Sequence, residues 1–464
     1  MFKLKNIINQ KKNEGQIIKI LFYTFPLSFI IGNLAISINT ILFIIISLFF
    51  IKKKQLSIRF DKSVWILIIF FLYFFLSTSV QFLYPGFLNT ELVNYPLETN
   101  PLLKSFLLFR FVLLILVIDT LLYNNKINLK NFCFSSLICT SFVSFDVILQ
   151  YFIGVDLFGY KNFVNWNSGP FGDELIAGSY LKNFSLFSLV YIFLNFKKII
   201  FKNSLLIFIL SLHLTAILLS GNRMPLVLFL FGCFLLFFLI KNMKFSISLG
   251  TIFFCIIFFG LAKNDKVLKQ NYAVFLGDIN FSKLFNEKVI ENDDSLTTVS
   301  KNVVLLRHSG YSRVFKTAIV MWKKQPLVGF GLKSFRVKCW EILDEDSRKS
   351  DQPQDISCGN HPHNYYLELL SESGIIGVVL IISFFILMLR YSFFIIKGIY
   401  RIGSNELILL TPPIISVILE IWPLRSSGSF FTNTNATFLW LVVGMLLSSS
   451  VKNSLYKNLA EKNT

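Results

Sequence analysis

The chain has 464 residues, 54% of them hydrophobic, with 54 phenylalanines and a formal net charge of +19. This composition excludes an ordinary soluble globular protein, because apolar runs of membrane-spanning length recur along the chain. The positive charge could suggest nucleic acid as a partner, but the lysines fall in short clusters between the apolar runs, as at Lys52–Lys54. We interpret them as a membrane-orientation signal and expect no nucleic acid.

Apolar runs of about 15 to 24 residues predict an all-α polytopic membrane protein with about 12 transmembrane helices. The run after the basic N-terminus lacks a small-residue cleavage site, so we expect a retained anchor. We find no internal repeat, which weakens the alternative of a secondary transporter. The expected spans are 20–34, 37–51, 64–83, 105–122, 132–153, 177–195, 204–220, 225–240, 245–262, 365–389, 405–422 and 433–450.

One large loop separates the ninth and tenth spans. We therefore expect a membrane bundle at 1–262, a loop region with helices at 263–364 and a second membrane bundle at 365–464. Lys and Arg concentrate on one side of the spans, and the positive-inside rule makes that side cytoplasmic. Both termini then lie inside, and the large loop lies outside. The short outer loops hold four cations: Lys104, Lys161, Arg223 and Arg425.

Charged residues within the predicted spans are few, and such residues are usually paired or functional because their burial in a bilayer is costly. Arg110 lies toward the outer end of its span and is a candidate for binding an anionic lipid. We expect structural partners, or a position facing a cavity, for Asp119, Asp146 and Glu420.

Arg223 follows Ser220-Gly221-Asn222 in a predicted hairpin between the seventh and eighth spans. An arginine at headgroup level can hold a phosphate with two hydrogen bonds. The alternative is a snorkelling arginine that only marks the interface. We prefer the first interpretation because Arg313, at the start of an expected helix in the large loop, could join Arg223 on the same membrane face.

Two cysteines, Cys339 and Cys358, fall in the large outer loop, where an oxidising compartment would allow them to pair. We expect a disulfide between them, which would fix the backbone three residues before His361. In the chain-entropy model such a link contributes about 3 kcal/mol. The alternative is two free thiols. The other cysteines lie in predicted spans: Cys133, Cys139, Cys233 and Cys255.

His361-Pro362-His363-Asn364 stands where the large loop enters the tenth span, followed by Glu368 and Glu372. The imidazole of His363 can titrate near neutral pH and act as a general base for a sugar hydroxyl. The alternative is a structural histidine bonded to a loop carbonyl. We interpret His213, in an apolar span, and His308, in a loop, as packing or surface residues.

The sequence contains no His-Glu-x-x-His zinc motif and no phosphate loop with Gly-Lys-Ser/Thr. We therefore expect chemistry without a metal ion or another cofactor.

Four separated segments together resemble the O-antigen ligase and O-antigen polymerase superfamily of bacterial envelope enzymes. The similarity is clearest over about 165–380. The chain departs from the simplest family pattern at Gly172-Asp173-Glu174, where many relatives have an asparagine-containing segment. The segments are Ser168 to Tyr180, Ser220 to Arg223, Arg313 to Gly331, and His361 through Glu372 and Gly374 to Gly377.

The resemblance implies a metal-independent, inverting glycosyltransferase in the bacterial inner membrane, acting on an undecaprenyl-pyrophosphate-linked glycan at the periplasmic face. Arg223 and Arg313 would hold the donor pyrophosphate, and His363 would deprotonate the acceptor. The possible supporting residues are His361, Asn364, Glu372 and Arg110.

The acceptor distinguishes the main alternatives. A ligase of lipopolysaccharide biosynthesis would use lipid A-core, which is the function we expect, whereas a polymerase would use another carrier-linked repeat. A protein O-oligosaccharyltransferase has the same architecture. From other classes, a polytopic transporter or flippase and a structural membrane protein stay open as alternatives.

Overall fold

The computed structural model describes residues 15–83, 100–163, 166–265, 268, 272, 310–347, 356–426 and 428–448. Every named secondary-structure element within these residues is a helix, and the two isolated β-bridges belong to no strand. The predicted all-α class is therefore confirmed for this part of the chain. Much of the predicted loop region, including His308, lies outside the described residues.

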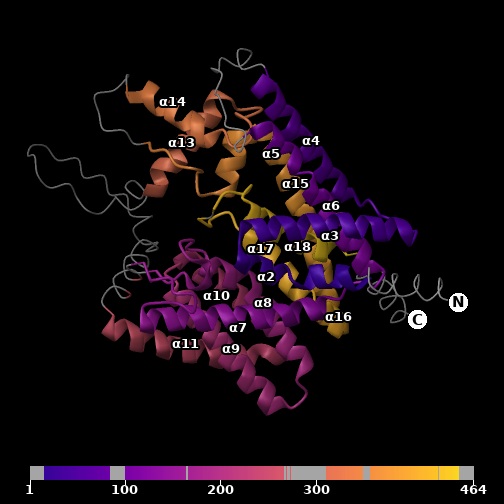
Figure 1. Ribbon diagram of the computed structural model, residues 1–464, viewed down its shortest axis with the longest axis vertical. Helices are drawn as coiled ribbons and strands as arrows, with labels where there is room; N and C mark the ends of the chain where they lie inside the picture. The colour runs from indigo at the N-terminus through magenta and orange to yellow at the C-terminus, as the bar shows by residue number, and fades with distance from the viewer. Residues whose placement is uncertain are drawn as a thin grey trace, which may run out of the picture.

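Figure 1 shows the helices along the chain. Their bounds are α2 (Phe25–Ile31), α3 (Asn33–Lys53), α4 (Lys62–Leu83), α5 (Pro101–Leu107), α6 (Arg110–Tyr123), α7 (Leu129–Ile153), η3 (Gly169–Phe171), α8 (Ala177–Asn195), α9 (Ile199–Leu219), α10 (Arg223–Leu239), η4 (Lys241–Met243), α11 (Lys244–Asn264), α13 (Gly310–Lys324), α14 (Phe335–Ser347), α15 (Tyr365–Ile402), α16 (Asn405–Ile408), α17 (Thr411–Glu420) and α18 (Asn433–Leu447).

Within the described residues, seven helices are long and apolar enough to cross a membrane, and two more, α10 and α18, are apolar but shorter. These helices are typical of a multi-pass membrane protein. The predicted number of about 12 spans stays a prediction. The seven are Asn33–Lys53, Lys62–Leu83, Pro101–Tyr123, Leu129–Ile153, Ile199–Leu219, Lys241–Asn264 and Tyr365–Ile402.

Several helices differ in length from the predicted spans. The predicted span 405–422 is divided between α16 and α17, and α17 has proline in its first turn. Proline suits that place because it lacks a backbone N–H, which would have no partner within the helix. The expected span 365–389 lies within α15, which continues to Ile402.

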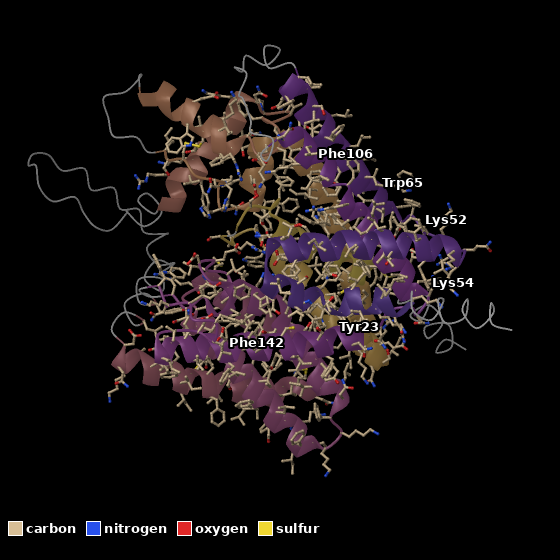
Figure 2. The ribbon with its side chains drawn as sticks, viewed as in Figure 1. Tyr23, Lys52, Lys54, Trp65, Phe106 and Phe142 are labelled. Carbon is tan, nitrogen blue, oxygen red and sulfur yellow. A yellow bond between two sulfur atoms is a disulfide. The ribbon has the colours of Figure 1, made fainter. Side chains whose placement is uncertain are left out.

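The outer surface of the helical bundle is largely apolar. Trp65 on α4 and Phe106 on α5 are 54% and 59% exposed, and both project outward in Figure 2. Apolar side chains of this size are rarely exposed in such numbers on a protein surrounded by water. Lipid tails are their expected surroundings, so these two helices present a lipid-facing side.

The buried apolar residues form two clusters of very different size. The large cluster runs through the bundle, where the buried Trp440 packs against Phe71 and Phe384. In Figure 1, α13 and α14 lie apart from α7, α9 and α11. The small cluster joins α13 and α14 and consists of Val314, Ala318, Met321, Phe335 and Cys339.

Glycine allows the turn that follows α13 to pack closely against α15. Gly374 interrupts the α15 helix with a φ of 63°, and a Cβ there would collide with the carbonyl of Leu327. The close approach allows backbone hydrogen bonds from Phe330 N to Ser371 O (3.0 Å) and from Ile375 N to Pro326 O (2.9 Å). The turn after α13 is therefore fixed on the kink of α15.

Candidate functional site

His363 lies immediately before the capped start of α15. Its φ of 54° is in the left-handed region, which is uncommon for a residue other than glycine. Asn364 caps the helix, because its Oδ1 accepts hydrogen bonds from the backbone N–H groups of Tyr366 (3.0 Å) and Leu367 (3.2 Å). The Nδ2 of Asn364 also donates to the carbonyl of Pro423 (2.9 Å). These bonds hold the backbone next to His363 in one conformation.

The histidine that precedes this turn by two residues is close to it in space. The ring centroids of His361 and His363 are 4.2 Å apart. Both side chains are partly buried. The structure therefore presents the two imidazoles as one group at the start of α15.

The loop before His363 is tied to the helix that carries Arg313. A disulfide joins Cys339 in α14 to Cys358, with a Cα to Cα distance of 5.6 Å. The Oγ1 of Thr317 in α13 donates to the carbonyl of Ser357 (2.8 Å). Arg313 lies one turn before Thr317 and is exposed. The structure therefore places the Arg313 helix and the His363 loop in one folded unit.

Arg223 is the first residue of α10, in the hairpin that follows α9. The preceding Asn222 bonds to the start of α8: its Oδ1 accepts from Gly178 N (3.2 Å) and its Nδ2 donates to Leu175 O (3.2 Å). A Cβ on Gly178 would lie 2.6 Å from the Oγ of Ser220. The predicted hairpin motif and the segment before α8 thus pack directly on each other.

The elements of the predicted site meet around α15. Helices α13 and α14 pack against α15, and α10 packs against α15 and α17. Both arginines therefore lie on helices that contact the helix following His363. The convergence of the Arg223, Arg313 and His363 side chains on one point stays a prediction.

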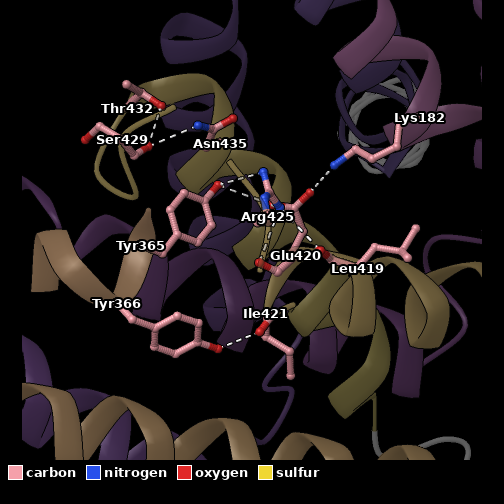
Figure 3. Close-up of polar contacts among 10 residues, drawn as sticks. All are labelled: Lys182, Tyr365, Tyr366, Leu419, Glu420, Ile421, Arg425, Ser429, Thr432 and Asn435. Atoms are coloured by element: carbon pink, nitrogen blue, oxygen red, sulfur yellow. Dashed lines mark hydrogen bonds and ion pairs between the residues drawn. The ribbon is translucent and has the colours of Figure 1, made fainter. Parts of the chain in front are cut away.

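A buried ionic network lies beside the first turn of α15 (Figure 3). Glu420, at the end of α17, accepts hydrogen bonds from Lys182 on α8 and from Nη1 of Arg425 (2.6 Å). The hydroxyl of Tyr365 donates to Glu420 (3.3 Å), and the Arg425 guanidinium lies 4.7 Å from the centre of the Tyr365 ring. The sequence analysis expected a partner for Glu420 but identified neither Lys182 nor Arg425.

This network is satisfied by its own members. Burial lowers the pKa of Arg425, but the Glu420 carboxylate and Tyr365 together raise it by more, so that the net shift is upward and the guanidinium stays charged. Its charge and its hydrogen bonds are used within the protein. We therefore assign the network the structural role of joining α8, α15 and α17.

The carboxylates of α15 also bond to protein groups. Glu372, predicted to support the site, accepts from the backbone N–H groups of Lys333 (2.9 Å) and Phe335 (3.4 Å). Glu368 accepts from the Ser429 hydroxyl and from Phe430 N (2.6 Å). In the part of the chain that the structure describes, no three His, Cys, Asp or Glu residues form a group that could hold a metal ion. The two glutamates fix neighbouring backbone.

A cavity of about 640 Å³ lies beside these segments. Its wall combines the start of α3, the α5 to α6 junction, the start of α8, the start of α14 and residues 428–435. Arg110 lines it and donates from Nη2 to Asn433 Oδ1 (2.8 Å). Its charged lining residues are Lys104, Arg110, Lys333, Arg336 and Glu174. The sequence singled out Arg110 as a candidate and named Lys104 only as an outer-loop cation; it did not bring them together with Lys333 and Arg336, because the two pairs are far apart in the chain.

The fold and these residues define a helical membrane protein with a histidine loop and a basic cavity. Residues 206–382 match the family model described as O-antigen ligase. The match confirms the resemblance to the O-antigen ligase and polymerase superfamily over these residues, and it supports a function of the ligase or polymerase type. It includes Arg223, Arg313 and His363, whereas the segment from Ser168 to Tyr180 lies outside it. No curated protein matches the chain.

Proposed function

We propose that the protein is an O-antigen ligase-like glycosyltransferase. It would move a glycan from undecaprenyl pyrophosphate to an acceptor such as lipid A-core at the periplasmic face of the bacterial inner membrane. The observation that carries the proposal is the His363 loop, which lies within the matched domain and is fixed to the Arg313 helix. A rigidly held base favours catalysis because it is already aligned when the acceptor binds.

In this mechanism the imidazole of His363 accepts the proton of the acceptor hydroxyl. The acceptor oxygen then bonds to the anomeric carbon from the side opposite the pyrophosphate. The bond between that carbon and the phosphate oxygen breaks, and its electron pair leaves with the undecaprenyl pyrophosphate. Configuration at the anomeric carbon inverts.

Arg223 and Arg313 would stabilise the negative charge that grows on the leaving pyrophosphate. A guanidinium keeps its charge and can hold two phosphate oxygens in a fixed geometry. Such preorganised donors act most strongly on charge that develops in the transition state. The proposal therefore assigns no step to a metal ion.

The proposed orientation follows from the distribution of Lys and Arg, which puts both termini in the cytoplasm and the His363 loop in the periplasm. The Cys339–Cys358 disulfide supports this orientation, because disulfides persist in oxidising compartments such as the bacterial periplasm. A labelling reagent that cannot cross the membrane should reach the loop from the periplasm only.

The proposal is tested by profiling envelope glycans in cells with wild-type protein or His363→Ala at equal membrane levels. We expect a loss of roughly 100- to 10,000-fold in transfer, the range that general-base catalysis supplies. Polymer that stays on the carrier supports a ligase, whereas single repeats support the alternative, an O-antigen polymerase. His361→Ala is the second variant, since it removes the neighbouring imidazole and leaves the proposed base; a smaller loss there than in His363→Ala is expected for a supporting residue.

An unchanged profile in His363→Ala cells would contradict the mechanism. It would favour a transporter or flippase, for which glycan movement across vesicle membranes should survive the same substitution. Arg223→Lys and Arg313→Lys add a second test, because lysine keeps the positive charge but cannot form the two parallel hydrogen bonds.

A further inference from the structure

We propose that the cavity lined by Lys104, Arg110, Lys333 and Arg336 is a binding site for a phosphorylated saccharide, separate from the contacts of His363. The inference deepens the proposed function and rests on it only in taking the bound saccharide to be a substrate. The cavity volume of about 640 Å³ is within the range of small-molecule sites in proteins.

The charge of the lining favours an anion. The lining contains four basic side chains and one acidic side chain, that of Glu174, which is exposed. The buried Glu368 and Glu372 attract Lys333 electrostatically and offset part of its charge. Lys333 also donates from Nζ to the hydroxyl of Ser429 (2.8 Å). The argument for an anionic ligand therefore rests chiefly on Arg110 and Arg336.

Two guanidinium groups of the lining each have one hydrogen-bond donor without an acceptor in the described residues. The Nε of Arg110 and the Nε of Arg336 are both buried, and neither has an acceptor among the described residues. Glu368 attracts Arg336 electrostatically, but its two oxygens accept from Ser429 and Phe430. A buried donor without an acceptor is costly, and a phosphate offers several acceptor oxygens that match the guanidinium geometry.

The rest of the lining suits sugar hydroxyl groups. Amide and hydroxyl side chains such as Asn33, Asn183, Asn435 and Thr434 line the same cavity; Thr434 donates to Asn33 Oδ1 and Asn435 donates to Ser429 O, and their remaining groups can bond to a ligand. The Oδ1 of Asn183 is buried and has no donor among the described residues. Amides both donate and accept hydrogen bonds, as the hydroxyl groups of a saccharide require. Cations beside amides therefore indicate a ligand that carries both phosphate and sugar.

The cavity is physically connected to both parts of the candidate site. Leu175 and Gly178, which flank the lining residue Ile176, bond to Asn222, the neighbour of Arg223. The segment that begins at Pro423, the partner of Asn364, leads to the cavity wall at 428–435. Short backbone segments thus tie the cavity wall to the Arg223 hairpin and to the His363 loop.

The test is calorimetric titration of the full-length protein in lipid nanodiscs with a hexose 1-phosphate, with the neutral hexose and with inorganic pyrophosphate. We expect the hexose 1-phosphate to bind and the neutral hexose to bind at least tenfold more weakly. Arg336→Gln and Arg110→Gln should each weaken binding roughly 10- to 100-fold, since each removes charged hydrogen bonds. Lys323→Gln, an exposed cation of α13 outside the cavity, is the matched control and should bind as wild type does.

Glu174→Gln separates a binding defect from misfolding. It removes the acidic group of the lining, so the hexose 1-phosphate should bind several-fold more tightly, an outcome that a damaged fold does not produce. Equal binding of the neutral hexose, or wild-type affinity in both arginine variants, would overturn the proposal.

Competition with farnesyl pyrophosphate distinguishes two sources of the phosphate. Displacement of the hexose 1-phosphate identifies the pyrophosphate end of a lipid-linked glycan, and binding without displacement identifies a phosphorylated sugar of another molecule. The His363→Ala protein should bind the hexose 1-phosphate as wild type does. If the cellular glycan profile of His363→Ala is also unchanged, the proposed function fails and the cavity assignment stands. If the wild-type protein does not bind the hexose 1-phosphate but transfer depends on His363, the cavity assignment fails and the proposed function stands.

Discussion

The Lys182–Glu420–Arg425 network and the arginines of the candidate site differ in how their charges are balanced. The network is buried, and its charged groups bond to one another. Arg313 is exposed on α13, which the Thr317 bond to Ser357 ties to the loop before His363, and the Cys339–Cys358 disulfide ties the same loop to α14. In the network, the ionic contacts themselves stabilise the fold. In the unit formed by α13, α14 and the His363 loop, the disulfide and the Thr317 hydrogen bond stabilise the fold, and the Arg313 guanidinium stays accessible. Stability and activity should therefore respond to different substitutions in the two regions.

The largest effect on stability should come from the network. Glu420→Gln leaves Lys182 and Arg425 buried together without a carboxylate, so we expect a loss of about 3–5 kcal/mol in the free energy of unfolding. Denaturant unfolding in detergent would measure it. The control is Glu406→Gln, because Glu406 is an exposed carboxylate in the first turn of α16 and should contribute about 0–1 kcal/mol. Equal losses in the two variants would erase the contrast between buried and exposed charge.

An intermediate loss of stability is expected when the disulfide between α14 and the loop before His363 is removed. Cys339→Ser removes the disulfide and should destabilise the α13 to α14 unit by about 2–4 kcal/mol, with faster proteolysis of the His363 loop. Cys255→Ser, at an exposed free cysteine of α11, is the matched control. Reduction of the wild-type protein should expose two additional thiols. A thiol count that does not change on reduction would contradict the link itself.

The smallest effect should come from the helix cap beside His363. Asn364→Ala removes the Oδ1 acceptor and should cost about 1 kcal/mol of stability, while transfer activity falls because the His363 turn loosens. Asn364→Asp keeps the acceptor for the backbone N–H groups and loses only the donor to Pro423. Thermal unfolding and glycan profiling of both variants would separate the two bonds. Full activity in both would show that His363 does not depend on this cap.

Hydropathy alone predicted that the chain forms apolar helices, because a membrane-spanning run is a local property of the sequence. The hydropathy pattern was less informative about which apolar runs form one long, strongly apolar helix. The predicted span 177–195 coincides with α8, yet α8 is not among the seven long apolar helices, and 405–422 contains two helices. At the junction of α16 and α17, the N–H groups of Leu409 and Leu410 bond locally to Asn405 O and Leu407 O, and the hydropathy pattern contains no sign of this turn.

In the motif from His361 to Gly377, the sequence identifies candidate residues but not the contacts that they make. The sequence marked Asn364, Glu372 and Gly374 but not their roles, since each partner lies elsewhere in the chain. Only the structure pairs Asn364 with Pro423, Glu372 with the backbone of Lys333, and Gly374 with the carbonyl of Leu327. A side chain near a candidate base can thus cap a helix or fix neighbouring backbone without contacting the substrate.

By itself, the sequence determined the helical membrane class, the superfamily resemblance and the residues His363, Arg223 and Arg313 as candidates, because composition and short motifs are local. Only the tertiary structure decided the partners of Glu420 and the presence of a basic cavity. Lys182 and Glu420 are 238 residues apart, and the cavity is lined by segments from α2 to α18. Such contacts depend on how helices pack, and packing fixes partners that no local pattern of residues specifies.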